Sequence, residues 1–214
     1  MLWVYTRLVK YFHWIFKHEN VSADWLAGQI KSRRMGKKFG IKKERYFFAH
    51  DEQQFSIGEN SHINKESSIW CHDNDDTGPV EGGKSGRGYL RIGSNVYIGL
   101  RFCAACYDEV TIGDDCLLAD DILIMTANHG MNPEIPGSYV KQPFTVGGVH
   151  IEEGCWIGSR VTVLPDVTIG KRCIIGTNSV VTKDIPPYSI AVGIPARVVK
   201  RWDFDSHRWE RYLR

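Results

Sequence analysis

His129 stands at a point where an otherwise regular sequence pattern stops. It belongs to the hexapeptide MTANHG, Met125 to Gly130, and the chain that follows is rich in Pro and Gly until the pattern resumes at Ile151. A histidine side chain titrates near neutral pH, so it can take a proton from a weak nucleophile such as a hydroxyl group. His129 is therefore a candidate general base, provided that the surrounding elements hold it at an accessible place.

The surrounding pattern is a six-residue repeat. Anchor residues recur six positions apart in five groups of three, and fourteen of the fifteen anchors are Ile, Leu or Val. A glycine follows seven of the anchors, and the position four residues after an anchor is usually small or aliphatic. The anchors are Ile57, Ile63 and Ile69; Ile92, Ile98 and Ala104; Ile112, Leu118 and Ile124; Ile151, Ile157 and Val163; Ile169, Ile175 and Val181.

This spacing predicts an all-β solenoid, a parallel β-helix of hexapeptide repeats. Each hexapeptide supplies a short strand and a tight turn, with the anchor pointing into a narrow core. Three hexapeptides make one triangular coil of roughly 18 residues, and stacked coils bury their apolar rows against each other. The small corner positions include Cys116, Cys155 and Cys173, which we interpret as reduced core residues. Cys103 and Cys106 form a lone CxxC, and without a second pair for zinc we expect it to be structural.

Residues 48–201 are expected to form the solenoid and to carry two extruded loops. The first, residues 71–88, reads CHDNDDTGPVEGGKSGRG. Its acidic start lacks the spacing and the closing Glu of an EF-hand, so we expect a solvated turn there and no metal site. The second loop, residues 129–150, leaves the scaffold at His129, and such extrusions add specificity to a rigid framework.

The two ends of the chain differ from the solenoid. Residues 1–47 carry eleven Lys or Arg and three acidic residues, with apolar residues at helical spacing, which predicts a basic helical segment. That segment would pack on the solenoid end or on a partner subunit; a membrane-surface contact is the alternative, and no nucleic-acid motif accompanies the charge. Residues 202–214 are predicted to be a short C-terminal helix. With no signal peptide and no apolar run long enough to span a membrane, we expect a cytoplasmic protein, with attachment to the inner membrane face as a variant.

The hexapeptide repeat, together with VVTKDIPPYSIAVGIPARVVK from Val180 to Lys200, resembles the left-handed β-helix acyltransferases. Within that superfamily the chain is similar to the galactoside, maltose and capsule-type sugar O-acetyltransferases and to the streptogramin acetyltransferases. The resemblance implies left-handed coiling and acetyl transfer from acetyl-CoA to a hydroxyl of a sugar or surface-polysaccharide precursor. It also implies that His129 is the general base in a direct attack on the thioester, without an acyl-enzyme. A homotrimer with active sites between adjacent solenoids is expected.

Further site residues follow from the same resemblance. A backbone N–H in WIGSR, which points to Ser159, would stabilise the oxyanion, and Trp156 would border the acetyl or acceptor pocket. Asn128 and Met131 are expected to contact the acceptor. The expected CoA contacts are Gly176, Thr177, Thr182, Lys183, Lys200 and Arg201. The galactoside-type enzymes carry an Asn in the coil before the histidine coil, where it binds acceptor hydroxyls. The corresponding stretch here, LRFCAACYDEV, has no Asn, so the acceptor of that subgroup cannot be assigned to this chain.

Other functions stay open at this point. Acetylation of an antibiotic is the second candidate, because TANHGM also resembles the streptogramin enzymes. A non-catalytic β-helix scaffold is the third. A γ-type carbonic anhydrase shares the β-helix but needs two metal-binding histidines five positions apart, and the repeat contains no such pair. We therefore expect no metal requirement.

Overall fold

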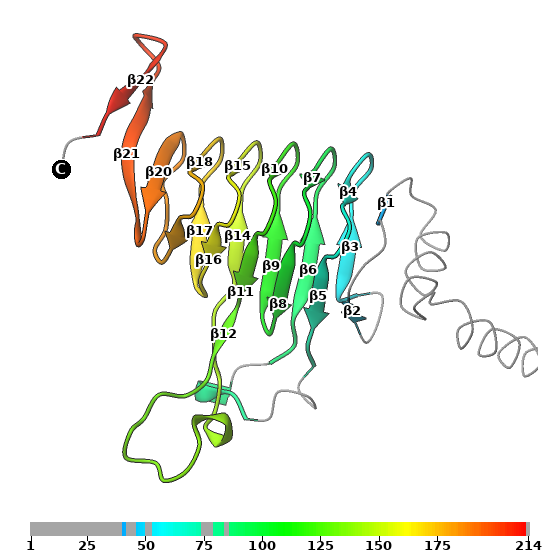
Figure 1. Cartoon of the computed structure of the whole chain (residues 1–214). Helices are drawn as coiled ribbons and strands as arrows, with labels where there is room; N and C mark the ends of the chain where they lie inside the picture. Colours follow the sequence, from blue (N-terminus) through cyan, green and yellow to red (C-terminus); the bar gives the residue numbers. More distant parts are fainter. Residues whose placement is uncertain (1–39, 42–45, 50–52, 74–78, 84–85, 213–214) are drawn as a thin grey trace, which may run out of the picture.

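The computed structural model describes residues 40–41, 46–49, 53–73, 79–83 and 86–212. Within these ranges the regular elements are short β-strands and two single-turn 3₁₀ helices, as Figure 1 shows. The 3₁₀ helices are η1 (Glu81–Gly83) and η2 (Tyr139–Lys141), and both lie in loops that leave the body of the molecule.

Five successive coils form that body, and each coil contributes three strands. The first coil contains β3 (Phe55–Ile57), β4 (His62–Ile63) and β5 (Ser68–Cys71), and the second β6 (Tyr89–Ile92), β7 (Tyr97–Ile98) and β8 (Cys103–Cys106). The third contains β9 (Glu109–Ile112), β10 (Leu117–Leu118) and β11 (Leu123–Met125). The fourth contains β14 (Val149–Ile151), β15 (Trp156–Ile157) and β16 (Thr162–Val163), and the fifth β17 (Val167–Ile169), β18 (Ile174–Ile175) and β19 (Val180–Val181).

Equivalent strands of successive coils pair in parallel and form three sheets. We call them face 1 (β3, β6, β9, β14, β17), face 2 (β4, β7, β10, β15, β18) and face 3 (β5, β8, β11, β16, β19). The chain visits face 1, face 2 and face 3 in that order in every coil, so each coil has a corner between each pair of faces. The expected parallel β-helix of hexapeptide repeats is the architecture observed.

The anchors of successive coils are direct register partners. On face 1, Ile112 pairs with Ile151, which pairs with Ile169; on face 2, Leu118 pairs with Ile157. All fifteen anchors are at most 4 % exposed. The predicted core is therefore confirmed, and its rows run at right angles to the strands through the whole stack.

The corners use a backbone conformation that sequence reasoning did not anticipate. The residue three positions after an anchor lies in the left-handed region at most corners, although it is usually not glycine. These residues are Asn60, Glu66, Asn95, Arg101, Asp115, Asp121, Arg160, Asp166, Arg172 and Asn178. Glycine is needed instead directly after the anchor, where coils approach closely: a Cβ on Gly113 would lie 2.6 Å from the Glu153 backbone nitrogen.

The N-terminal part of the chain is not helical where the structure describes it. Strand β1 (Gly40–Ile41) pairs with β4, and β2 (Tyr46–Ala49) pairs with β5, so both extend the sheets beyond the first coil. The prediction of a helix over residues 1–47 is wrong for these strands, because the edge of the first coil offers unpaired backbone groups that a strand satisfies. Residues 1–39 and 42–45, on which the rest of that prediction and the membrane-surface contact fall, lie outside the described residues.

The C-terminal part is a β-structure, so the predicted helix over residues 202–214 is wrong. Strand β20 (Ser189–Gly193) continues face 2, and β21 (Ala196–Asp203) and β22 (Arg208–Arg211) add to it as antiparallel strands. The rings of Trp202 and Trp209, opposite each other in this hairpin, contact edge to face at 5.4 Å.

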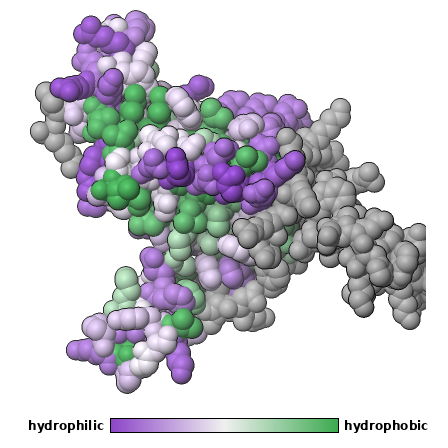
Figure 2. All heavy atoms as spheres, in the orientation of Figure 1, coloured by the Kyte–Doolittle hydropathy of each residue, from purple (hydrophilic) through white to green (hydrophobic). Residues whose placement is uncertain are grey.

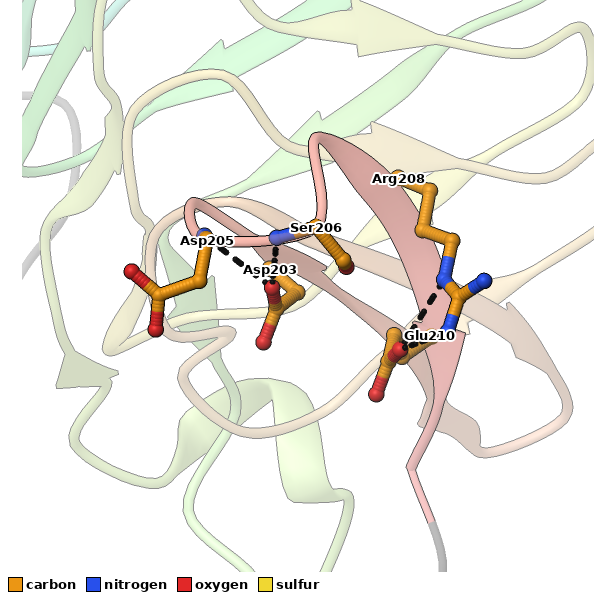
Figure 3. A network of polar contacts seen from close by, with 5 residues as sticks. All are labelled: Asp203, Asp205, Ser206, Arg208 and Glu210. Atoms are coloured by element: carbon orange, nitrogen blue, oxygen red, sulfur yellow. Dashed lines mark hydrogen bonds and ion pairs between the residues drawn. The ribbon is translucent and has the colours of Figure 1, made fainter.

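The turn of this hairpin is closed by polar contacts, which Figure 3 shows from close by. The Asp203 carboxylate accepts hydrogen bonds from the backbone N–H groups of Ser206 and Asp205, at 2.6 and 3.0 Å. These donors, Ser206 first, hold the pKa of Asp203 below its ordinary value. An Asp that satisfies the N–H groups two and three residues ahead is typical of a turn, and this turn brings β22 back along β21.

The cysteines are free thiols, as expected. The thiols of Cys116, Cys155 and Cys173, in the small corner positions, donate to the carbonyl oxygens of Glu152, Gly170 and Pro186. Burial raises the pKa of the Cys173 thiol to about 11. Cys103 and Cys106 lie three positions apart on strand β8 and point to opposite sides of it, so they cannot act as one pair.

In the described part of the chain, no helix is long and apolar enough to cross a membrane.

The packing of the thiols predicts their reactivity. In the native protein at pH 8, the five buried cysteines (Cys71, Cys106, Cys116, Cys155 and Cys173) should resist iodoacetamide, because a thiol needs both access and deprotonation to react. In denaturant all six thiols should react, counted by intact-mass spectrometry. Rapid native labelling at several sites would contradict this core, and fewer than six labels after unfolding would contradict the free thiols.

Candidate active site at the corner between faces 3 and 1

Both long loops leave the solenoid at the same corner, the one between faces 3 and 1. The first connects β5 to β6, and the second connects β11 to β14 (Figure 1). The second loop begins with a short antiparallel stem of β12 (Ala127–Asn128) and β13 (Thr145–Val146), and it then projects away from the coils. Figure 2 shows hydrophilic and hydrophobic surface side by side on this projection.

His129 follows β12 directly and is exposed to solvent. Its imidazole ring contacts the ring of Phe144, which comes from the other side of the stem, with centroids 4.5 Å apart. The Phe144 ring stacks on Tyr107 at 5.2 Å, and Tyr107 stacks on His72 at 3.9 Å. Four rings from three consecutive coils thus form a column at this corner, with His129 at its outer end.

The two loops are also joined through their backbones. Val80 forms a β-bridge with Phe144. The Glu81 N–H donates to the Phe144 carbonyl at 2.8 Å, and the Phe144 N–H donates to the Pro79 carbonyl at 3.0 Å. The prediction of a solvated turn for residues 71–88 is therefore incomplete, because residues 79–81 form part of the wall beside His129.

Two buried polar side chains fix the loop. The hydroxyl of Thr126 accepts from the N–H groups of Tyr107 and Asp108 and donates to the Ala105 carbonyl, which ties β12 to the coil below. The Gln142 amide donates to the Asn132 carbonyl and accepts from the Asn132 N–H, each at 2.9 Å. Because the Thr126 and Gln142 side chains are buried and hydrogen-bonded to the backbone, they restrain the start of the loop after His129.

The two residues expected to contact the acceptor lie beside His129. Asn128 is exposed in β12, and Met131 is 73 % exposed on the projecting loop. The structure thus places Asn128, His129 and Met131 on one accessible edge.

The residues expected near the acetyl group lie elsewhere in the same chain. Trp156 is 51 % exposed on the outer side of face 2, and Ser159 lies in the turn that leads from face 2 to face 3. Gly176 and Thr177 occupy the same corner one coil later, where the Asn178 N–H donates to the Ser159 carbonyl at 2.9 Å. Within one chain these four residues are on a different edge from His129.

Two other expected CoA contacts lie at the same corner as His129, the one between faces 3 and 1. Thr182 and Lys183 form the corner between faces 3 and 1 in the fifth coil, two coils beyond His129. At the strand spacing of a β-sheet, two coils correspond to about 10 Å. Lys183 lines a hollow of about 190 Å³ together with Arg197 and Tyr212. Arg197 was not singled out from the sequence, although it lies within the ARVVK stretch that carried the resemblance.

A second hollow, of about 420 Å³, is aromatic. It is lined by Trp156, Tyr188, Trp202, Phe204 and Trp209, with Gly154, Arg172 and Ile174. Of the remaining expected CoA contacts, Lys200 and Arg201 lie exposed on β21, and the Arg201 guanidinium lies over the ring of Tyr212, which lines the first hollow, at 5.7 Å from the ring centroid. In the described ranges, no cluster of three or more His, Cys, Asp or Glu side chains could hold a metal ion.

Comparison with known proteins places the chain in a family. Residues 148–183 match the family model for the bacterial transferase hexapeptide (six repeats), and residues 89–119 match that for the hexapeptide repeat of succinyl-transferase. The chain is 33 % identical over 134 residues to WbbJ of Escherichia coli (strain K12), whose name refers to O-acetyl transfer in lipopolysaccharide biosynthesis; the match covers 59 % of this chain and 67 % of WbbJ. The chain belongs to the hexapeptide-repeat acyltransferases.

Two other members are also similar. The galactoside O-acetyltransferase of Escherichia coli (strain K12) is 39 % identical over 128 residues, which cover 56 % of this chain and 61 % of that protein. The crystal structure of the polySia-specific acetyltransferase NeuO superposes with a TM-score of 0.59 at 26 % identity, covering 76 % of this chain and 68 % of that one. The chain therefore spans about three fifths to two thirds of the length of these hexapeptide-repeat acyltransferases.

Within this hexapeptide-repeat acyltransferase, the clamp between Gln142 and Asn132 predicts local stability. Gln142→Ala should remove two buried hydrogen bonds, so amide exchange in residues 130–142 should accelerate about tenfold, equivalent to about 1.4 kcal/mol of local opening free energy. The melting temperature of the solenoid should change little, because the loop projects from it. Ser138→Ala, which removes only an exposed cap on η2, is the matched control. Unchanged exchange in the Gln142 variant would show that the clamp does not order the loop.

Proposed function

We propose that this chain transfers an acetyl group from acetyl-CoA to a hydroxyl of a sugar or of a surface-polysaccharide precursor. The observation that carries the proposal is the position of His129. Its exposed imidazole lies at the corner between faces 3 and 1, from which both long loops project. The names of the similar proteins refer to galactoside, lipopolysaccharide and polysialic acid acetylation, and these names favour a glycan acceptor over an antibiotic. The left-handed sense of coiling is part of the same proposal.

In the proposed reaction, the acceptor oxygen attacks the thioester carbonyl while His129 takes the hydroxyl proton. The carbonyl oxygen becomes an oxyanion, for which the backbone N–H of Ser159 is the proposed donor. The C–S bond then breaks, the acetyl ester forms, and the CoA sulfur leaves with the proton from His129. The step needs no acyl-enzyme, and the high pKa and burial of Cys173 give that thiol no part in it.

The proposed assembly is a homotrimer with sites between adjacent copies. The arrangement of the predicted residues supports it, because Trp156, Ser159, Gly176 and Thr177 lie on a different edge from His129 in one chain. A neighbouring copy that presents face 2 to the corner of His129 would bring the two groups together. Acetyl-CoA would then contact Lys183 and Arg197 with its phosphates, since both cations line one hollow two coils from His129.

The role of His129 is tested by His129→Ala. Acceptors for the assay are methyl β-galactoside, maltose and a sialic acid oligomer, with release of the CoA thiol as the readout. The variant should lose at least about 100-fold in kcat, the usual contribution of a general base, while the KM for acetyl-CoA stays within about threefold. His207→Asn, at the exposed turn of the C-terminal hairpin, is the control and should behave like the wild type. Equal turnover by the wild type and His129→Ala would refute the proposed base.

The CoA contacts are tested by Lys183→Ala and Arg197→Ala. Each should raise the KM for acetyl-CoA about tenfold, or about 1.4 kcal/mol of binding free energy, and leave kcat nearly unchanged. The effect should shrink at high salt, because phosphate contacts are screened. Arg91→Ala, on face 1 and paired with Glu109, removes an exposed cation elsewhere and serves as the control. An unchanged KM in both variants would place the CoA phosphates at another part of the chain.

A further inference from the structure

The ring of Phe144 is held from two directions. On one side it stacks on Tyr107, at 5.2 Å between centroids and 22° between ring planes, and Tyr107 in turn lies nearly parallel to His72. The Phe144 ring also contacts the His129 imidazole, at 4.5 Å between centroids and 37° between ring planes. His72 and Tyr107 follow strands β5 and β8 of the solenoid, so the column rests on the most regular part of the molecule.

The backbone of Phe144 is fixed as well. Both its N–H and its carbonyl are bonded to the first loop, at Pro79 and Glu81, and the neighbouring residues Thr145 and Val146 pair with β12. Phe144 is therefore the residue at which the first loop, the second loop and the ring column meet. A shift of its ring would break one of these contacts, whereas His129 is exposed to solvent.

A general base must present one ring nitrogen to the acceptor hydroxyl within hydrogen-bond reach, and small displacements of a reacting group cost rate. An exposed imidazole that rotates freely about its side-chain bonds would spend most of its time out of line. Contact with a fixed aromatic ring restricts these rotations without supplying a group that competes for the proton.

We propose that Phe144 is a positioning residue for His129: its ring, fixed by the column on Tyr107 and His72 and by the bridge to the first loop, holds the imidazole in the orientation needed for proton transfer. This inference rests on the proposed function, in which His129 is the general base. Phe144 acts on the orientation of the base and takes no part in binding CoA, so its loss lowers kcat and leaves the KM for acetyl-CoA unchanged.

The test compares Phe144→Leu with Phe144→Tyr. Leucine keeps the apolar volume but removes the ring, and kcat should fall about tenfold with the KM for acetyl-CoA within twofold. Tyrosine keeps the ring, so kcat should stay within about threefold of the wild type. Phe47→Leu is the matched control, because it removes a ring from an aromatic pair, with Phe55 at 5.0 Å, at the end of the stack beyond the first coil and outside the proposed site. Wild-type kcat in Phe144→Leu, or an equal loss in Phe144→Tyr, would overturn the proposal.

A second readout does not depend on turnover. In protein labelled with ¹³C-histidine, the His129 ring signal is assigned by its absence in His129→Ala. Loss of the Phe144 ring should displace this signal, whereas Phe47→Leu should leave it in place; an unmoved signal in Phe144→Leu would contradict the contact. If Phe144→Leu does not fold, as judged by circular dichroism, Tyr107→Leu removes the supporting ring one step further away and should displace the same signal.

The experiments can refute the two proposals, His129 as the base and Phe144 as its positioning residue, independently of each other. If His129→Ala turns over like the wild type, the proposed base is wrong, whatever Phe144 does. If His129→Ala is inactive but Phe144→Leu keeps the wild-type kcat, the base stands and only the positioning role is wrong.

Discussion

The whole structure depends on backbone hydrogen bonds between successive coils. Most strands on face 2 have only two residues, too few to be stable alone, and each obtains its hydrogen bonds from the coils on either side. The Leu117 N–H, for example, donates to the Cys155 carbonyl, and the Trp156 N–H to the Cys173 carbonyl, each at 2.9 Å. Because this register allows no slippage, a corner residue in one coil has a fixed position relative to corner residues in every other coil.

This constraint accounts for the place at which we propose the chemistry. The faces consist of paired backbone and buried anchors, so variable side chains can accumulate only at corners and on outward positions. At one corner the chain inserts two loops without disturbing the coils, since β11 and β14 keep their parallel neighbours on both sides of the insertion. A rigid edge with two loops tied together at Phe144 is a suitable support for the proposed base, His129, which would have to keep its orientation.

The sequence was sufficient to predict the coils but not the contacts between the two loops. Anchors such as Ile112, Ile151 and Ile169 could be aligned from their spacing alone. The six-residue period of the sequence and the burial of the anchors have the same cause, because each strand points one anchor into the core. The C-terminal helix was predicted wrongly, because WDFDSHRWERYL has apolar residues that suit a helix or a hairpin, and pairing with β20 decides between them. The break at His129 was visible in the repeat. The column of His72, Tyr107 and Phe144 was not, because its rings come from segments up to 72 positions apart that only the stacking of coils brings together.

The central claim is that His129 lies against the reacting atoms, and a crystal structure with CoA and an acetylatable sugar tests it most directly. The account predicts the acceptor hydroxyl within about 3 Å of a ring nitrogen of His129, with the CoA sulfur beside it and the phosphates near Lys183 and Arg197 of one of the copies. A CoA sulfur bound more than about 10 Å from every His129 in the assembly would contradict it, because no proton transfer could then reach the attacking oxygen.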